Sequence, residues 1–283
     1  MTSASCSDMS LAAGESLSAS ATTAEHWLLL EVSGSWPRDV SANGALSASA
    51  QDAVTRWHER TPGSRLLFIR RPGRAASSPL AFLVHATEVT AEVRRIALEH
   101  PRDLVDVDFE RDGDREDRQL VLVCGHGSRD ACCARRGVAV YGALAERLTD
   151  DVELWISSHQ GGHRFAGNVL VLPAGLQFGR LDPQNAAAVV SGALEGRIEL
   201  DRYRGRTFHA QPIQAAEQAV REALGLDSVA DLHLAGVEGG IVRFRGQDGA
   251  EYQARVDEIV GPIVPASCGA EPEAQKSFSA RTV

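Results

Sequence analysis

The sequence predicts an α/β (α+β) protein of about two domains, for three reasons. Short apolar runs with the length of strands alternate with stretches of helical periodicity. The chain has 283 residues, a length that fits about two domains of ordinary size. Its hydrophobic content of 43% and charged content of 24% are those of a globular protein.

Composition also limits the possible partners. The net charge of −9 disfavours nucleic acid, which needs a basic surface, and is compatible with an acidic electron carrier that docks on basic partners. No apolar run approaches the roughly 18–20 residues that span a bilayer. The first residues lack the basic and apolar regions of a secretion signal and include Asp8 and Glu15. We therefore expect a cytoplasmic protein with no nucleic-acid or membrane partner.

The first half of the chain is expected to form one unit at 25–110, after a flexible arm at 1–24. Apolar runs predict its strands, and helical periodicity predicts its helices. The expected strands are 26–32, 65–70 and 80–85, and the expected helices are 45–60 and 88–99. A loop rich in Pro, Gly and Ser, RRPGRAASSP, joins the second and third strands.

A charged stretch at 110–118 is expected to be a solvated linker to a second unit at 119–200. The expected elements of this unit are strands at 120–123 and 152–156, a hairpin of 168–172 with 176–180, and helices at 132–148 and 182–194. A βαβ half followed by a ββα half is the order of a thioredoxin-like domain. The first unit has a similar order, which suggests a degenerate copy of that domain.

The last part of the chain is expected to be a small α+β region at 201–265 and a disordered tail at 266–283. An amphipathic helix at 212–224 has Ile213, Ala216 and Val220 on one face. Three short strands are expected after it, near 230–234, 240–245 and 251–256. Nothing in this region carries recognisable chemistry.

Soft ligands gather at the ends of two expected neighbouring strands of the second unit. Cys124 ends the first strand, and eight residues separate it from Cys133, at the start of a helix. His159 and His163 follow the next strand of the sequence, with Gly161 and Gly162 between them. Glycine pairs disfavour a helix, so we place the histidines on a loop whose N–H groups could approach a bound sulfide. The pattern indicates a metal or iron–sulfur site.

Several residues near this site leave alternatives open. Spacing alone permits either Cys132 or Cys133 as a ligand. His126 is expected to be a solvent-facing loop histidine. Arg129 and Asp130 form an ion pair that shapes the loop, or Arg129 lies near the metal and tunes it. The terminal Cys6 and Cys268 are interpreted as free thiols without a special role, because each lies in a segment expected to be loose.

The segments CGHGSRDACCARRG and SSHQGGHRFAGN resemble the sucrase/ferredoxin-like family of thioredoxin-fold ferredoxins. Its signature, C-x8-C with RD in the loop and then HxGGHxxAxN, is matched here by Cys124, Arg129, Asp130, Cys133, His159, Gly161, Gly162, His163, Ala166 and Asn168. The resemblance implies one [2Fe–2S] cluster held by two cysteines and two histidines. It favours Cys133 over Cys132 and supporting roles for Arg129, Asp130, Gly161, Gly162 and Asn168.

Carried over, the ligands are Cys124, Cys133, His159 and His163, and we place both cysteines on one iron and both histidines on the other. The resemblance implies an electron-transfer protein with an unidentified redox partner rather than a stand-alone enzyme. Two alternatives remain: a structural Cys2His2 zinc site, which uses the same ligand types, and a thioredoxin-like thiol oxidoreductase. The second lacks the C-x-x-C that this chemistry needs at the strand-to-helix turn.

Overall fold

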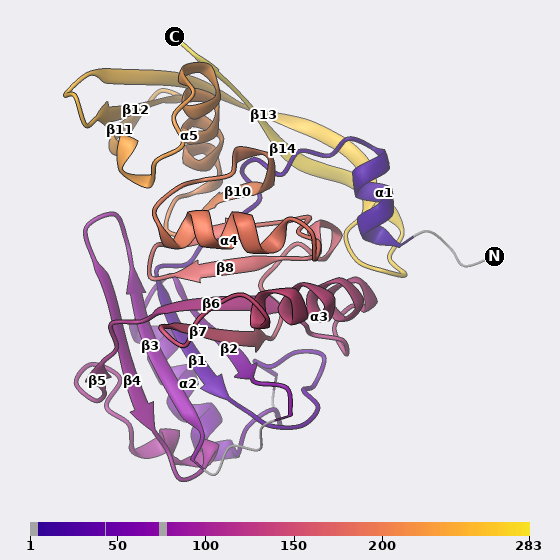
Figure 1. The fold of residues 1–283 in the computed structure, drawn as a ribbon, viewed down its shortest axis with the longest axis vertical. Helices are drawn as coiled ribbons and strands as arrows, with labels where there is room; N and C mark the ends of the chain where they lie inside the picture. Colours follow the sequence, from indigo (N-terminus) through magenta and orange to yellow (C-terminus); the bar gives the residue numbers. More distant parts are fainter. Residues whose placement is uncertain (1–4, 43, 74–77) are drawn as a thin grey trace.

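The computed structural model describes residues 5–42, 44–73 and 78–283, which form two β-sheets with helices packed on them (Figure 1). The expected arm residues 1–4 and the loop residues 74–77 lie outside the described residues. The helices are α1 (Cys6–Ala12), α2 (Ala48–Arg60), α3 (Ala131–Ala145), α4 (Ala186–Leu194) and α5 (Gln211–Leu224), with short 3-10 turns η1 (Pro101–Asp106), η2 (His163–Phe165), η3 (Leu200–Arg202) and η4 (Val229–Asp231).

The larger sheet has ten strands in the order β10-β9-β8-β6-β7-β2-β1-β3-β4-β5. Its strands are β1 (His26–Glu31), β2 (Ser64–Arg70), β3 (Leu80–Ala86), β4 (Ala91–Ala97), β5 (Asp114–Arg115), β6 (Gln119–Cys124), β7 (Val152–Ser157), β8 (Val169–Leu172), β9 (Leu176–Phe178) and β10 (Tyr203–Arg206). The smaller sheet has four strands in sequence order: β11 (Leu232–Glu238), β12 (Ile241–Gly246), β13 (Glu251–Pro265) and β14 (Pro272–Thr282).

The larger sheet contains the same strand order twice. In the second unit β6 pairs parallel with β7 and antiparallel with β8, and β8 pairs antiparallel with β9. In the first unit β1 pairs parallel with β2 and antiparallel with β3, and β3 pairs antiparallel with β4. The orders β7-β6-β8-β9 and β2-β1-β3-β4 therefore correspond, and antiparallel pairing of β2 with β7 joins them. This correspondence is what two copies of one unit would give.

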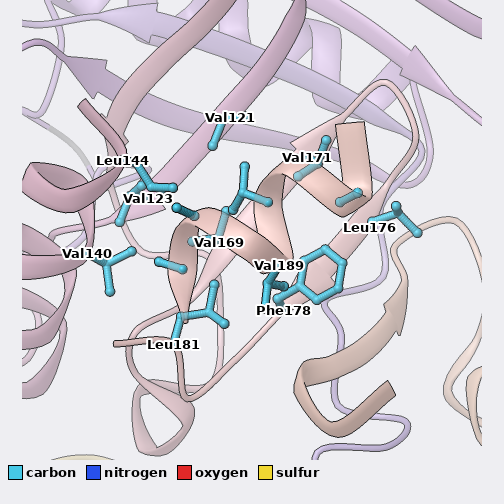
Figure 2. Packing of buried hydrophobic residues seen from close by; sticks show 14 of the residues in the cluster. Val121, Val123, Val140, Leu144, Val169, Val171, Leu176, Phe178, Leu181 and Val189 are labelled. Carbon is cyan, nitrogen blue, oxygen red and sulfur yellow. The ribbon is translucent and has the colours of Figure 1, made fainter. Parts of the chain in front are cut away.

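The core of the second unit fixes α3 and α4 on the same face of the sheet. Val121 and Val123 of β6 pack with Val140 of α3 and Val189 of α4 (Figure 2). On the other face, Leu122 and its neighbours in β7 and β8 join apolar residues of the first unit in a shared cluster. Because β6 is buried on both faces, its position and the position of Cys124 at its end are fixed by packing.

Three expectations for the fold are wrong. The arm at 1–24 contains α1 and buried residues, and Glu15 accepts a 2.7 Å bond from Arg164. The segment 88–99 contains strand β4 rather than a helix, because its backbone pairs with β3 along seven residues. The tail at 266–283 contains β14, which pairs with β13. In each case contacts with another segment of the chain order a stretch whose local pattern is weak.

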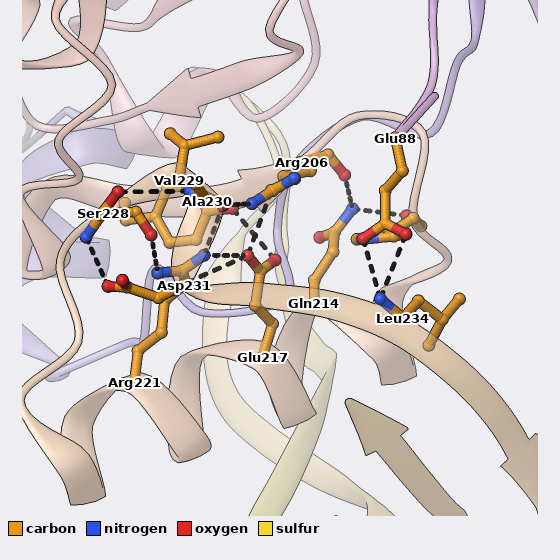
Figure 3. Close-up of polar contacts among 12 residues, drawn as sticks. Glu88, Arg206, Gln214, Glu217, Arg221, Ser228, Val229, Ala230, Asp231 and Leu234 are labelled. Atoms are coloured by element: carbon orange, nitrogen blue, oxygen red, sulfur yellow. Dashed lines mark hydrogen bonds and ion pairs between the residues drawn. The ribbon is translucent and has the colours of Figure 1, made fainter. Parts of the chain in front are cut away.

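The C-terminal region packs α5 on the smaller sheet and is held to the larger sheet by polar contacts. The carboxylate of Glu217, on α5, lies 3.2 Å from Arg206 Nε and 3.0 Å from Arg221 Nη2 (Figure 3). Glu88, in the first unit, accepts bonds of 3.0 and 3.1 Å from the N–H of Leu234 in β11. Within the described residues, no helix is long and apolar enough to cross a membrane.

Candidate metal centre

Close packing of α3 on β6 brings Cys133 to Cys124. Cys124 ends β6, and Cys133 lies in the first turn of α3. Gly137, one turn further along α3, lies so close to β6 that an added Cβ would be 2.0 Å from the carbonyl oxygen of Cys124. Asp130 begins the helix, since its Oδ1 accepts a 2.8 Å bond from the N–H of Cys132. The glycine and the cap together set where Cys133 lies.

The two histidines lie on a loop between β7 and β8, as expected. Their rings stack with centroids 3.7 Å apart and an angle of 10° between their planes. Gly161 and Gly162 have φ angles of 91° and 69°, in the left-handed region that favours glycine. A Cβ on Gly162 would also lie 2.5 Å from Arg204 Nη2. The structure thus gives the glycine pair a role in shaping this loop.

The four expected ligands come together at one place. The ligand atoms of Cys124, Cys133 and His159 all lie within 4.8 Å of one another. Nδ1 of His163 lies 3.7 Å from Sγ of Cys133. Cys124, Cys133 and His163 are buried, whereas His159 is half-buried. Nδ1 of His159 is buried and has no hydrogen-bond partner among the described residues, so it is available to a ligand.

The two thiols of this site have opposite acidities. The neighbouring Cys133 and His159 hold the pKa of Cys124 well below its usual value, despite its burial. The neighbouring Cys124, together with burial, raises the pKa of Cys133. Burial and the neighbouring His159 lower the pKa of His163 to about 4, which leaves its imidazole neutral at pH 7. A thiolate and a neutral imidazole are the forms that bind metals.

Asn168 and Arg204 hold the histidine loop in place through hydrogen bonds. The Asn168 side chain donates a 2.9 Å bond to the Gly162 carbonyl and accepts one of 2.9 Å from Arg204 Nη1. Arg204 also donates to the Gly161 carbonyl at 3.2 Å. Arg204 lies in β10 and is 1% exposed. The sequence gives little indication that Arg204 is buried, because an arginine beside a glycine is usually found at the surface.

Two residues of the cysteine loop differ from expectation. His126 is 2% exposed, not solvent-facing, because its Nε2 lies 2.8 Å from the Pro37 carbonyl oxygen and its Nδ1 accepts from the N–H of His159. Arg129 forms no ion pair with Asp130 within the described residues, since the carboxylate of Asp130 accepts from backbone N–H groups instead. His126 therefore positions a candidate ligand.

Cys132 lies apart from the four candidate ligands and faces a second group of thiols. Its Sγ is 3.5 Å from Sγ of Cys6 and 3.2 Å from Sγ of Cys268. Cys6 and Cys268 are free thiols, as expected, but they lie beside Cys132 rather than in loose terminal segments. The ordered α1 and the β13–β14 hairpin bring both cysteines to the start of α3.

A comparison with protein families covers the part of the chain that contains the four candidate ligands. The model of the sucrase/ferredoxin-like family matches residues 17–205, well over half of the chain. This chain belongs to the sucrase/ferredoxin-like family. The match includes Cys124, Cys133, His159 and His163 and excludes Cys6 and Cys268.

Curated relatives resemble this sucrase/ferredoxin-like chain over a limited stretch. Altered inheritance of mitochondria protein 32 from Debaryomyces hansenii is 34% identical over 97 residues, 31% of this chain and 36% of that protein. The protein of the same name from Meyerozyma guilliermondii is 35% identical over 96 residues, 31% of this chain and 34% of that protein. The chain thus matches about a third of the length of these relatives.

One solved structure similar to part of the chain is a thioredoxin-like [2Fe–2S] ferredoxin from Aquifex aeolicus. It has 20% sequence identity and a TM-score of 0.25, and the alignment covers 29% of this chain and 84% of the ferredoxin. Its Cys55Ser variant gives 23% identity and a TM-score of 0.24 over 28% of this chain and 88% of that one.

Proposed function

We propose that this chain holds one [2Fe–2S] cluster through Cys124, Cys133, His159 and His163 and acts in electron transfer. The observation that carries the proposal is the convergence of these four side chains from β6, α3 and the histidine loop. The buried Nδ1 of His159, which has no protein partner, is the kind of orphaned atom that a metal would satisfy. The donor set of two thiolates and two imidazoles suits a [2Fe–2S] cluster.

The spread of the donor atoms favours two metal atoms over one. A single tetrahedral zinc with bonds of about 2.0–2.3 Å needs its four ligand atoms within roughly 4 Å of one another. Here the four proposed ligands, all in the described part of the chain, do not form one group of atoms within 4.8 Å. Cys124, Cys133 and His159 form one such group, and His163 forms another with Cys133 and Asp130. The family resemblance implies both cysteines on one iron and both histidines on the other.

When bound, the cluster would exchange one electron at a time. The ligand set of this chain determines how easily that occurs, because neutral imidazoles in place of thiolates leave the site less negative and raise the reduction potential. Arg204 adds a buried positive charge nearby. Burial and Arg164 lower the pKa of Arg204 to about 9, and the nearby Cys124 and Cys133 oppose that shift. The site therefore contains a cation that favours a negatively charged reduced state.

An electron would enter or leave at the half-buried edge of His159, since the other three ligands are buried. We propose that a redox partner protein approaches there. The backbone N–H of His159 is held by His126, which is anchored on Pro37 of the first unit. All five cysteines are free thiols, which fits a reducing compartment such as the cytoplasm.

The test is metal and sulfide analysis of anaerobically purified full-length protein, with its visible absorption spectrum. We expect a brown protein with about two iron and about two sulfide per chain. Cys133→Ser should lose the iron and the colour, whereas Cys268→Ser, outside the site, should keep both. A colourless protein with one zinc that is lost in Cys133→Ser would establish the zinc alternative instead.

A further inference from the structure

A second group of metal-binding side chains lies beside the candidate cluster site. Sγ of Cys6 is 3.5 Å from Sγ of Cys132, Cys132 is 3.2 Å from Cys268, and Cys268 is 3.5 Å from Cys6. The carboxylate of Asp130 completes the group, and all four ligand atoms lie within 4.8 Å of one another. We propose that these residues form a second metal site that binds one Zn²⁺.

The distances fit a metal better than packing or a disulfide. Zinc with Zn–S bonds of about 2.3 Å places its sulfurs roughly 3.8 Å apart, close to the separations found here. A disulfide needs an S–S distance of about 2.05 Å and joins only two of three sulfurs. Thiolates are ligands that select zinc among the common divalent ions, and a carboxylate oxygen can supply the fourth position.

The surroundings are built to hold these side chains in place. Cys6 and Cys132 are buried, and Asp130 is 5% exposed. Oδ2 of Asp130 accepts a 2.8 Å bond from the N–H of Cys268 and lies 3.9 Å from Sγ of Cys6. The hydroxyl of Ser7 donates to Sγ of Cys132 at 3.4 Å, a contact typical of the groups around a bound thiolate. Cys268 is exposed, so an ion could reach the site from solvent.

The site joins three parts of the chain that are far apart in sequence. Cys6 comes from α1, Cys132 from the first turn of α3, and Cys268 from the turn between β13 and β14. Figure 1 shows α1 beside the ends of β13 and β14. A bound Zn²⁺ would displace the protons of three thiols and tie both ends of the chain to the helix that carries Cys133. Its role would be structural, because all four coordination positions come from the protein.

The proposal does not depend on the cluster. The family match at 17–205 includes neither Cys6 nor Cys268, so the second site is a feature of this chain's two terminal regions. Consecutive thiols on α3 serve the two sites, which makes them separable by mutation. Cys132 belongs to the zinc site and Cys133 to the candidate cluster site.

The experiment is metal analysis by mass spectrometry on full-length protein purified without chelators, followed by titration of zinc-depleted protein with Zn²⁺ alone. We expect about one zinc per chain in wild type. Cys268→Ser, at an exposed position, and Cys6→Ser should weaken zinc binding by at least about tenfold while leaving iron content and colour unchanged. The matched control Cys133→Ser should lose iron and keep zinc.

Three results would overturn the second site. The first is wild-type protein that contains no zinc and takes up none in the titration. The second is a disulfide between any two of Cys6, Cys132 and Cys268 in anaerobic protein. The third is zinc that is lost in Cys133→Ser but kept in Cys268→Ser, which would place it at the first site. A colourless protein that loses one zinc in Cys268→Ser would support the second site and refute the cluster.

Discussion

Cys132 and Cys133 are consecutive residues of α3, and their thiols face different groups of ligands. Sγ of Cys132 lies 3.2 Å from Cys268, and Sγ of Cys133 lies 3.7 Å from Nδ1 of His163. Successive residues of a helix point about 100° apart, so one turn can serve two sites. Asp130, which caps the helix, contributes to the ligand groups on both sides.

Gly137 sets the distance between α3 and Cys124. In Gly137→Ala the new methyl group would lie 2.0 Å from the Cys124 carbonyl oxygen, so the helix must shift and carry Cys133 away. We expect loss of most of the iron and a decrease of roughly 1–3 kcal/mol in the free energy of unfolding. The measurements are iron analysis and urea unfolding.

Gly142→Ala is the matched control on the same helix. An added Cβ at Gly142 meets no atom within 4 Å, and alanine favours the helix. We expect unchanged iron content and equal or slightly greater stability. If Gly137→Ala kept full iron content, close packing of α3 would not be what positions Cys133.

Asn168 is expected to support the histidine loop. Asn168→Ala removes the bond to the Gly162 carbonyl and leaves Nη1 of the buried Arg204 without its side-chain acceptor, at a cost of about 1–3 kcal/mol. The iron content should fall, because His163 follows Gly162 directly. Asn185→Ala, at the start of α4, removes hydrogen bonds to Asp182 and none to the histidine loop, and should keep its iron. Equal iron in the two variants would contradict this role.

His163→Cys tests the charge argument for the reduction potential. A thiolate in place of a neutral imidazole makes the site more negative, so the midpoint potential should fall by roughly 100 mV or more. A redox titration monitored by visible absorption measures this. His159→Cys should shift the potential in the same direction, and an unchanged potential in both variants would exclude histidine ligands.

The lowered pKa of Glu217 is expected to make the free energy of unfolding depend on pH. Burial opposes its ionised form, but Arg206 and Arg221 outweigh burial and lower its pKa. A carboxylate with a lowered pKa stabilises the fold above its unfolded pKa of about 4.3, and that contribution is lost as the pH falls through the folded value. Glu217→Gln leaves two buried arginines unpaired and should cost about 3 kcal/mol at pH 7.

The difference between wild type and Glu217→Gln should narrow when urea unfolding is repeated from pH 7 down to pH 3. Glu222→Gln changes an exposed residue of the same helix and serves as the control, with a small effect at every pH. A stability difference that stayed constant over this range would show that the carboxylate charge of Glu217 does not matter.

The four candidate ligands could be predicted from sequence because each lies next to a local signal. Cys124 ends an apolar strand, Cys133 begins an amphipathic helix, and His159 and His163 flank two glycines. The order of helices and strands along the second unit followed in the same way. These features depend on residues close together in the chain, where periodicity and turn residues are informative.

Most features that the sequence did not predict depend on contacts between distant segments. Cys6 and Cys132 are 126 positions apart, and Cys132 and Cys268 are 136 apart, so no spacing rule could join them. His126 is buried because it meets a carbonyl 89 positions away. The strand at Ala91–Ala97 is a different case, because its partner β3 is close in sequence but the local pattern of 88–99 does not distinguish a paired strand from a helix.

The most direct test of the cluster is pulsed EPR on the reduced full-length protein labelled with ¹⁵N-histidine. Two histidine ligands predict strong coupling of the unpaired electron to two histidine nitrogens in wild type and to one in His163→Cys. A reduced-cluster signal without histidine nitrogen coupling would contradict the proposed ligand set, and a protein without iron would contradict the cluster itself.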